Sequence, residues 1–171
     1  MAAEFVSGHR AFMREALQEA TAALALGEVP VGAVMVKGSE VIARAHNMME
    51  TSHDPTAHAE MLAIRAAASV VGAWRLEGLA LYVTLEPCPM CAGAIVEARI
   101  PLVVFGASDP RAGAVGSVMN VLDSAGLNHR PEVIRGVLEE ECAGLLKRFF
   151  LQRRNNASNW TGSYLERCQS G

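Results

Sequence analysis

Apolar residues near the start of the chain recur three or four positions apart, and an alternating pattern follows them. The spacing between His9 and Leu26 predicts a helix, which Gly27 would end. The apolar segment from Val29 to Val36 predicts a strand, and the segment from Glu40 to Ala45 suits its partner across a short Gly-containing turn. We therefore expect the domain to open with a helix and a β-hairpin.

Helices and strands alternate in the pattern that follows. Asp54 is typical of an N-cap and Pro55 of a first helical residue, so we expect a helix that runs to Ala68. Polar or glycine-rich segments predict loops at 47–55 and 107–128, the second with a short helix near 118–122. The remaining periodic segments predict strands at 79–85, 100–105 and 131–137, and helices at 88–99 and from 138 to about 153.

This order of elements predicts how the sheet is built. Alternation of helices and strands requires crossover connections, which join parallel strands, whereas the opening hairpin is antiparallel. We therefore expect a single α/β domain over residues 1–154 with a mixed five-stranded sheet. Residues 155–171 are polar, and we expect them to form a loosely ordered tail.

Composition and charge narrow the class of protein. A chain of 171 residues with 51% hydrophobic residues is sufficient for one hydrophobic core. The net charge of −3 argues against non-specific coating of nucleic acid, although it leaves room for a local basic patch. The first residues lack the basic and apolar regions of a signal peptide, and no apolar run is long enough to span a membrane. We expect a cytoplasmic protein with no membrane association.

Two short motifs carry the candidate chemistry. His58-Ala59-Glu60 and Pro87-Cys88-Pro89-Met90-Cys91 together supply one imidazole, two thiolates and one carboxylate. Three protein ligands leave one position of a tetrahedral zinc ion open, which is typical of a catalytic site. The spacing matches the H-x-E…P-C-x-x-C signature of zinc nucleobase deaminases, in which the glutamate moves protons and does not bind the metal. We therefore predict one Zn²⁺ per chain, held by His58, Cys88 and Cys91, with Glu60 as the catalytic acid and base.

The position of each motif on a helix matters for this prediction. Residues two apart on a helix point in different directions, so His58 and Glu60 can converge on one point only near the helix end. We expect His58 in the first turn of its helix. Cys88 and Cys91 share a face at the start of the next helix, where the helix dipole favours thiolates. Taken alone, the C-x-x-C pair also fits a redox site, and the H-x-E motif occurs often by chance.

A basic and aromatic cluster marks the end of the last predicted helix. It consists of Lys147, Arg148, Phe149, Phe150, Arg153 and Arg154. Cations of this kind can bind phosphates while a ring stacks on an exposed base of single-stranded RNA. The alternative is a helix end whose cations complement the dipole while the rings lie in the core. Two adjacent residues cannot both face the core, so one ring is exposed or lies in an interface.

Several longer segments resemble one family, the bacterial tRNA-specific adenosine deaminases of the cytidine/deoxycytidylate deaminase superfamily. The resemblance covers residues 10–154, and its more specific part lies toward the C-terminus, in Asn128-His129-Arg130 and Phe149-Phe150. The other segments that carry it are 26–33, His46-Asn47, 54–60, 82–94 and 104–107.

The resemblance implies a three-layer α/β/α fold of cytidine-deaminase type, a homodimer, and conversion of the wobble adenosine of a tRNA anticodon to inosine. It assigns contacts with the base and ribose to Asn47, the mouth of the pocket to Glu28 and Val29, and the anticodon backbone to the loop that contains Asp109. The full set of substrate-binding residues expected here is Glu28, Val29, Asn47, Asp109, His129, Arg148, Phe150 and Arg153.

Two other functions stay open at this point. Pro89 stands where the tRNA-specific family often has valine and where guanine deaminases also carry proline, which keeps a guanine or other free purine deaminase in view. A zinc-binding RNA module without catalytic activity is the second alternative, and an intact Glu60 argues against it. Ammonia release from free guanine or adenosine, compared with an anticodon stem-loop, separates the two enzymes.

Overall fold

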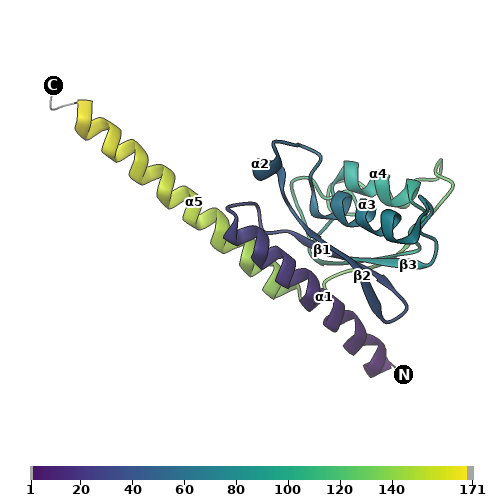
Figure 1. The fold of residues 1–171 in the computed structure, drawn as a ribbon. Coiled ribbons are helices and arrows are strands. Elements are labelled where there is room, and N and C mark those ends of the chain that lie inside the picture. Colours follow the sequence, from purple (N-terminus) through teal and green to yellow (C-terminus); the bar gives the residue numbers. More distant parts are fainter. Residues whose placement is uncertain (1, 169–171) are drawn as a thin grey trace.

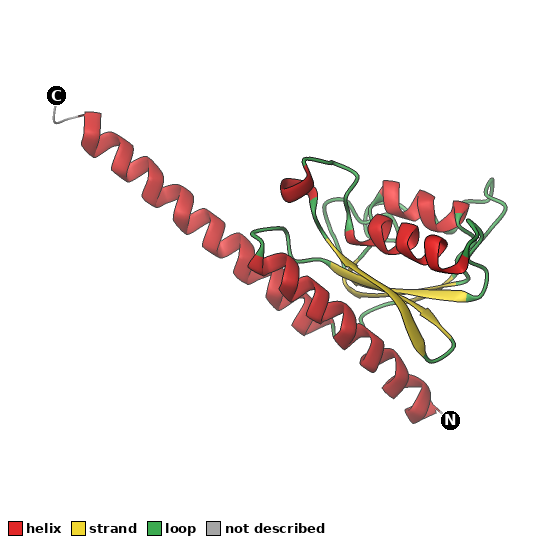
Figure 2. Ribbon diagram, viewed as in Figure 1, coloured by secondary structure: helices red, strands yellow, loops and turns green. Residues whose placement is uncertain are grey.

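The computed structural model describes residues 2–168, with side chains described from residue 8 to residue 155. Helices cover both faces of one sheet (Figures 1 and 2). The helices are α1 (Ala2–Ala25), α2 (Met49–Ser52), α3 (Ala59–Val71), α4 (Pro89–Glu97) and α5 (Glu139–Cys168). The strands are β1 (Gly32–Lys37), β2 (Glu40–His46), β3 (Leu79–Leu85), β4 (Leu102–Ala107) and β5 (Glu132–Ile134).

The sheet is mixed, as the sequence predicted, with the strand order β2-β1-β3-β4-β5. β1 pairs antiparallel with both β2 and β3, while β3, β4 and β5 are parallel. The last residues of β3 and β4, Leu85 and Ala107, lie opposite each other in the register. Chain segments that leave these two strands therefore start at the same edge of the sheet.

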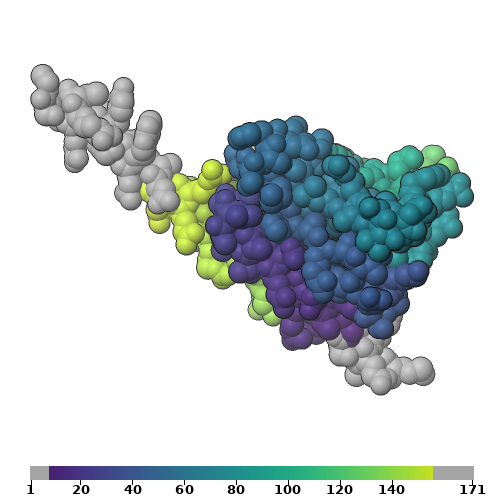
Figure 3. Space-filling model, viewed as in Figure 1, coloured from purple at the N-terminus to yellow at the C-terminus, as the bar shows by residue number. Residues whose placement is uncertain are grey.

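Two hydrophobic cores lie on opposite faces of this sheet. On one face, α3 and α4 pack against residues such as Met35, Leu81 and Val103. On the other face, α1 and α5 pack against neighbours of these residues in the same strands, including Val34, Tyr82 and Val104. The alternation of side chains along each strand thus supplies both cores. The predicted three-layer α/β/α fold is confirmed, and α1 lies beside the start of α5 on the molecular surface (Figure 3).

The structure corrects three predicted elements. α3 begins at Ala59, because Asp54 instead accepts hydrogen bonds from the backbone and hydroxyl of Thr56 and so closes a turn before the helix. The predicted helix near 118–122 is absent from this described segment, where Val115 and Asn120 form an isolated bridge. The helix expected to end near Arg153 continues to Cys168. Most of the predicted tail lies outside the residues whose side chains are described.

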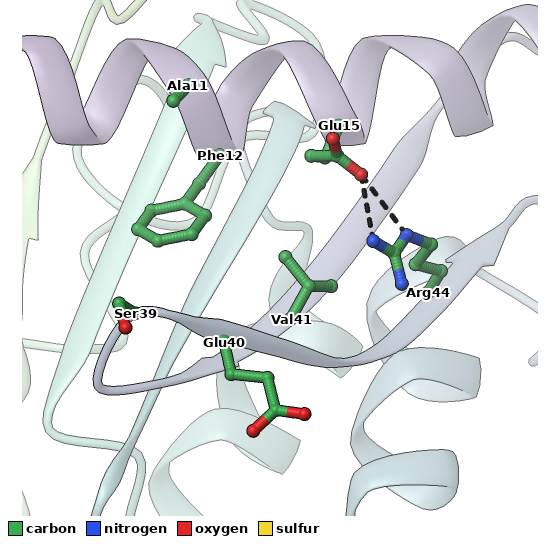
Figure 4. A pocket seen from close by; sticks show the side chains of 7 residues that line it. All are labelled: Ala11, Phe12, Glu15, Ser39, Glu40, Val41 and Arg44. Carbon is green, nitrogen blue, oxygen red and sulfur yellow. Dashed lines mark hydrogen bonds and ion pairs between the residues drawn. The ribbon is translucent and has the colours of Figure 1, made fainter.

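A surface pocket of about 390 Å³ lies between α1 and β2 with the turn that precedes it. Arg44 forms an ion pair with Glu15 at 2.9 Å at one side of it, and Phe12 lies at the other (Figure 4). The pocket is on the α1 side of the sheet, so it does not belong to the candidate metal site described below. None of the helices among the described residues is long and apolar enough to cross a membrane.

Candidate metal centre and active site

His58, Cys88 and Cys91 come together although 30 residues separate the first from the second. Their possible ligand atoms all lie within 4.8 Å of one another. The Nδ1 atom of His58 is 3.6 Å from Cys88 Sγ and also 3.6 Å from Cys91 Sγ. The two motifs predicted from sequence to share one site therefore do so.

The starts of two helices place these side chains. His58 is the N-cap of α3, and Cys88 is the N-cap of α4 with Pro89 at the first helical position. His58 has an extended backbone and lies just before the first turn, although its spacing from Glu60 had predicted a position within that turn. This position frees its side chain from the helical repeat, so it can approach a point that Glu60, inside the helix, also faces. Both helix N-termini carry partial positive charge, which favours thiolate sulfur at this point.

The separation of the donor atoms fits a tetrahedral zinc ion. Typical Zn–S and Zn–N bonds of about 2.3 Å and 2.0–2.1 Å place a sulfur and a nitrogen ligand about 3.6 Å apart. Both His58–cysteine distances have this value. One imidazole and two thiols are also the donor set that zinc accepts, with a fourth position left for another ligand. The residues can thus hold a metal ion without rearrangement.

The three donors alter one another's protonation. A hydrogen bond from Cys91 lowers the pKa of Cys88 to about 4, with a further contribution from His58. The same hydrogen bond, together with burial, raises the pKa of Cys91 above its usual value. The pKa of His58 is raised, chiefly by its hydrogen bond with Cys88. The three donors are therefore linked by hydrogen bonds into one group in which the charge of each depends on the others.

Glu60 lies in the first turn of α3 and is only 4% exposed. Burial raises the pKa of its carboxyl group to about 7. A carboxyl group that titrates near neutral pH can accept a proton in one step and donate it in a later one. Glu60 interacts with Cys91 through a side-chain hydrogen bond, and this contact puts its carboxyl group beside the donor cluster.

Two of the predicted substrate-binding residues, Asn47 and Glu28, accept hydrogen bonds from backbone N–H groups around the site. The side-chain oxygen of Asn47 accepts a hydrogen bond of 2.8 Å from Ala59 N, the first residue of α3. Glu28 is fully buried, and its carboxylate accepts hydrogen bonds from the backbone of Glu50 and Thr51 in α2. The neighbouring Val29 is half-buried and packs against the core under α3 and α4. Whether these residues also touch a substrate stays a prediction.

Asp109 and His129 lie at different ends of the parallel strands. Asp109 follows β4 and is half-buried at the strand edge that also leads to Cys88. The Nε2 atom of His129 is 2.7 Å from the carbonyl oxygen of Ile100, which precedes β4. Because β4 has six residues, about 20 Å of strand separates the two ends. The structure therefore does not bring His129 to the metal centre of its own chain.

The aromatic pair on α5 divides between core and surface, as the sequence required. Phe149 is 4% exposed and Phe150 is 46% exposed. Arg148 and Arg153 are also exposed, and the guanidinium of Arg153 lies 5.5 Å from the Phe149 ring. These residues lie on the α1–α5 side of the sheet, where they form a mixed basic and aromatic surface.

One buried acid near the metal centre was not singled out from sequence. Glu86 follows β3 directly, is 2% exposed, and lies two residues before Cys88. A charged residue at the end of an apolar strand was the available signal, since carboxylates are rarely buried without partners. Its hydrogen bonds join the segment after β4 to the surroundings of the metal centre.

Comparison with known proteins identifies the family. A model of the MafB19-like deaminases matches residues 7–154. The chain is 57% identical over 143 residues to the tRNA-specific adenosine deaminase of Bacillus subtilis (strain 168), and the match covers 84% of this chain and 89% of that protein.

Two solved structures show the same fold at high identity. One comes from biochemical and structural studies of A-to-I editing by tRNA:A34 deaminases at the wobble position; its TM-score is 0.77 and its identity 47%, over 79% of this chain and 98% of that chain. The other is the guanine deaminase of Bacillus subtilis, with a TM-score of 0.56 and 45% identity over 58% of this chain and 64% of that chain.

Proposed function

The chain belongs to the family of the tRNA-specific adenosine deaminases, within the MafB19-like deaminases, and from this premise we propose that it converts the wobble adenosine of a tRNA anticodon to inosine. The observation that carries the chemistry is the buried carboxyl group of Glu60 beside the His58, Cys88 and Cys91 donors. The 57% identity with a protein of that activity supports the choice of substrate.

We propose Zn²⁺ as the bound metal, one ion per chain. His58, Cys88 and Cys91 would hold it, and their 3.6 Å separations suit its bond lengths. When bound, zinc acts as a Lewis acid that makes hydroxide available at neutral pH. Cys91 and Ala59 are fully buried on the inner side of the site, whereas His58 and Cys88 are half-buried on the side from which a substrate would enter.

Glu60 then manages the protons of a hydrolysis that consumes one water molecule. Its carboxylate accepts a proton from the water as the oxygen adds to C6 of adenine, and it delivers that proton to ring nitrogen N1. The second proton of the water goes to the amino group, and the bond between C6 and this nitrogen breaks. Inosine and ammonia are the products, and Glu60 returns to its starting state.

An RNA loop is the proposed substrate, because deaminases of this kind act on bases that are unpaired or flipped out. The exposed Arg148, Phe150 and Arg153 on α5 supply cations and one free ring for such a loop. The buried Phe149 is excluded from stacking in this proposal and anchors the helix instead. Activity on tRNA also supports the cytoplasm as its location.

We also propose that the protein acts as a homodimer. Val118 and Met119 are 52% and 45% exposed in the connection between β4 and β5. Exposed apolar side chains that lie together suit an interface between protein chains. In a dimer, His129, which is remote from its own metal centre, could approach a substrate bound by the second copy.

A guanine deaminase is the second candidate, and both Pro89 and the resemblance to the guanine deaminase of Bacillus subtilis favour it. Ammonia release separates the two functions. We expect release from an anticodon stem-loop that contains the wobble adenosine, and far slower release from free guanine. Faster release from guanine than from the stem-loop would replace the proposed function with the second one.

A further inference from the structure

The buried carboxylate of Glu86 has no part in the chemistry described so far. It lies between the end of β3 and the start of α4. In the part of the chain with described side chains, no ion pair joins it to a cationic group. A carboxylate that is 2% exposed needs other partners, because an unsatisfied buried charge is costly.

All four of its hydrogen-bond donors belong to one short segment after β4. Oε1 accepts hydrogen bonds from the backbone of Val115 and Ser117, both at 3.0 Å. Oε2 accepts one from Asp109 N at 3.0 Å and one from the hydroxyl group of Ser117. Four donors occupy the lone-pair sites that a carboxylate offers. Glu86 thus closes residues 109–117 into a loop around its own side chain.

The loop packs closely around the Glu86 carboxylate, with no room for a larger residue at Gly113. A Cβ atom at Gly113 would lie 2.5 Å from Glu86 Oε2 and 2.5 Å from the carbonyl oxygen of Asp109. Glycine is therefore needed where the loop passes over the carboxylate. A backbone hydrogen bond from Ala114 N to Pro87 O at 2.9 Å joins the same loop to the segment that leads to Cys88, and one from Glu86 N to Ala107 O at 2.8 Å joins that segment to the end of β4.

The loop has a buried base and an exposed tip. Gly113, Ala114 and Val115 are buried, whereas residues 110–112 are exposed. Asp109 connects the two parts, since its backbone donates to Glu86 while its own carboxylate accepts from Arg111 N at 2.9 Å and Ala112 N at 3.3 Å. The conformation of the exposed tip is thus fixed by a chain of hydrogen bonds that begins at Glu86.

From these contacts we infer that Glu86 is a positioning residue, which holds the 109–117 loop at the rim of the metal centre so that its tip can receive the RNA. The inference rests on the proposed function for the identity of the ligand. Glu86 itself does not touch substrate, and it acts through the backbone of Asp109, Val115 and Ser117. Loss of its charge should therefore affect RNA binding more than the chemical step.

The test uses the zinc-loaded, full-length protein and the variant Glu86→Gln. Glutamine keeps the size of the side chain, but its amide nitrogen would face backbone donors. We expect hydrogen exchange of the 109–117 amides to become at least about tenfold faster, with zinc content unchanged, because the loop loses acceptors for its donors. The KM for an anticodon stem-loop should rise about tenfold while kcat changes less than about threefold, as expected for a loss of binding alone.

Two further variants are needed, one as a milder change in the same loop and one as a control outside it. Ser117→Ala removes one of the four donors and should give a smaller shift of the same kind, which matters if Glu86→Gln fails to fold. Leu79→Ala weakens the core at the start of β3, the strand end opposite to the loop, and should leave the exchange of residues 109–117 as in the wild type.

Unchanged loop exchange in Glu86→Gln and Ser117→Ala would overturn the inference. A lower kcat with unchanged KM, or loss of zinc, would do so as well, because it would make Glu86 part of the metal centre. If the wild-type protein fails to act on the stem-loop, the proposed function fails, and the exchange measurement still decides whether Glu86 positions the loop.

Discussion

Three buried carboxylates close to the site differ in the partners that surround them. Glu60 lies in an environment where burial raises its pKa to about 7. Burial would also raise the pKa of Glu28, but hydrogen bonds from Thr51 and Glu50 more than offset it and hold the pKa below its usual value. Burial likewise acts to raise the pKa of Glu86, and hydrogen bonds from Ser117, Asp109 and Val115 lower it instead. Glu60 is thus suited to move protons, whereas Glu28 and Glu86 are suited to accept hydrogen bonds from the backbone.

The lowered pKa of Glu28 predicts how its contribution to stability depends on pH. A group with a depressed pKa in the folded state stabilises the fold above its unfolded pKa, and this contribution is lost as the pH falls through the folded value. Glu28→Gln should lower the stability by about 1–3 kcal/mol near pH 7, because two backbone donors lose a charged acceptor. Thermal unfolding should show this difference shrinking as the pH falls below about 4.5.

Glu50→Gln is the matched control for this prediction, since Glu50 is an exposed carboxylate in the same helix that Glu28 binds. It should change the unfolding temperature little at any pH. A difference between Glu28→Gln and the wild type that stayed constant, or grew, toward acid pH would contradict the role assigned to Glu28.

At this scale the sequence predicted which residues form the donor cluster but not what the neighbouring acids do. The types and spacing of His58, Glu60, Cys88 and Cys91 match the donors and the carboxylate that zinc deaminases need, and such a pattern can be recognised in a sequence. The partners of Glu28 and Glu86 are backbone N–H groups more than 20 residues away, in a four-residue helix and an irregular loop. No residue pattern marks a backbone donor, so these contacts could not be read from the chain.

At the level of elements, α1 and β1 approach each other closely at Gly32. A Cβ atom at Gly32 would lie 2.1 Å from Ala16 O and 2.4 Å from Ala20 N. Both atoms belong to the backbone of α1, which can yield only if the helix moves. We expect Gly32→Ala to destabilise the protein by at least about 1–3 kcal/mol, as overpacked cores do, and denaturant unfolding measures this.

Gly93→Ala provides the comparison, because a Cβ atom at Gly93 in α4 meets nothing within 4 Å. Since alanine favours helix over glycine, this change should be neutral or stabilising by up to about 1 kcal/mol. Equal losses of stability in the two variants would show that helix packing at Gly32 is not as close as described.

The exposed surface of α5 predicts the salt dependence of RNA binding. If Arg148 and Arg153 each contact a phosphate, changing either to alanine should reduce the slope of log K against log salt by about 0.7. Phe150→Ala should cost about 1–3 kcal/mol of binding if its ring stacks on a base. Binding of an anticodon stem-loop at several salt concentrations measures both effects.

Lys37→Ala serves as the control for charge alone, since Lys37 is exposed at the end of β1, in the hairpin and not on α5. It should leave the slope unchanged. Normal slopes for the two arginine variants would rule out a role for α5 in holding RNA.

Element positions were predicted better than element ends. β3 begins and ends where the sequence placed it, because its apolar run is bounded clearly on both sides. The start of α3 was wrong, since Asp54 and Pro55 suit a tight turn as well as a helix N-terminus. The glycine-rich segment after β4 folds around a buried carboxylate and not into the expected short helix. Local signals cannot distinguish these alternatives when tertiary hydrogen bonds decide between them.

For the whole molecule, the alternation of helices and strands was sufficient to predict a mixed sheet between two helical layers. The parallel order of β3, β4 and β5 explains why the site lies at one edge. The segments that follow β3 and β4 leave the sheet there, and α4 and the 109–117 loop begin there. Which distant loops meet at that edge depends on crossovers whose paths the chain does not encode locally.

The homodimer is a prediction about the whole molecule. Sedimentation of the wild-type protein at micromolar concentration should give about twice the chain mass of 18.2 kDa. Val118→Asp places a charge in the exposed apolar part of the β4–β5 connection and should shift the protein toward monomer with loss of activity.

Val70→Asp is the control for the dimer, because Val70 is 65% exposed on α3, away from that connection. It should sediment as the wild type does. A wild-type protein that sediments at 18.2 kDa and retains full activity would contradict the proposed dimer.

We propose that Glu60 moves protons for a hydrolysis whose metal is held by three other residues. The most direct measurement follows inosine formation at the wobble position of an anticodon stem-loop, together with zinc content, in the wild type and in Glu60→Ala. We predict that the variant keeps about one zinc per chain and loses at least about 10²–10⁴-fold in rate. A variant that loses its zinc, or one that still forms inosine at the wild-type rate, would contradict this account.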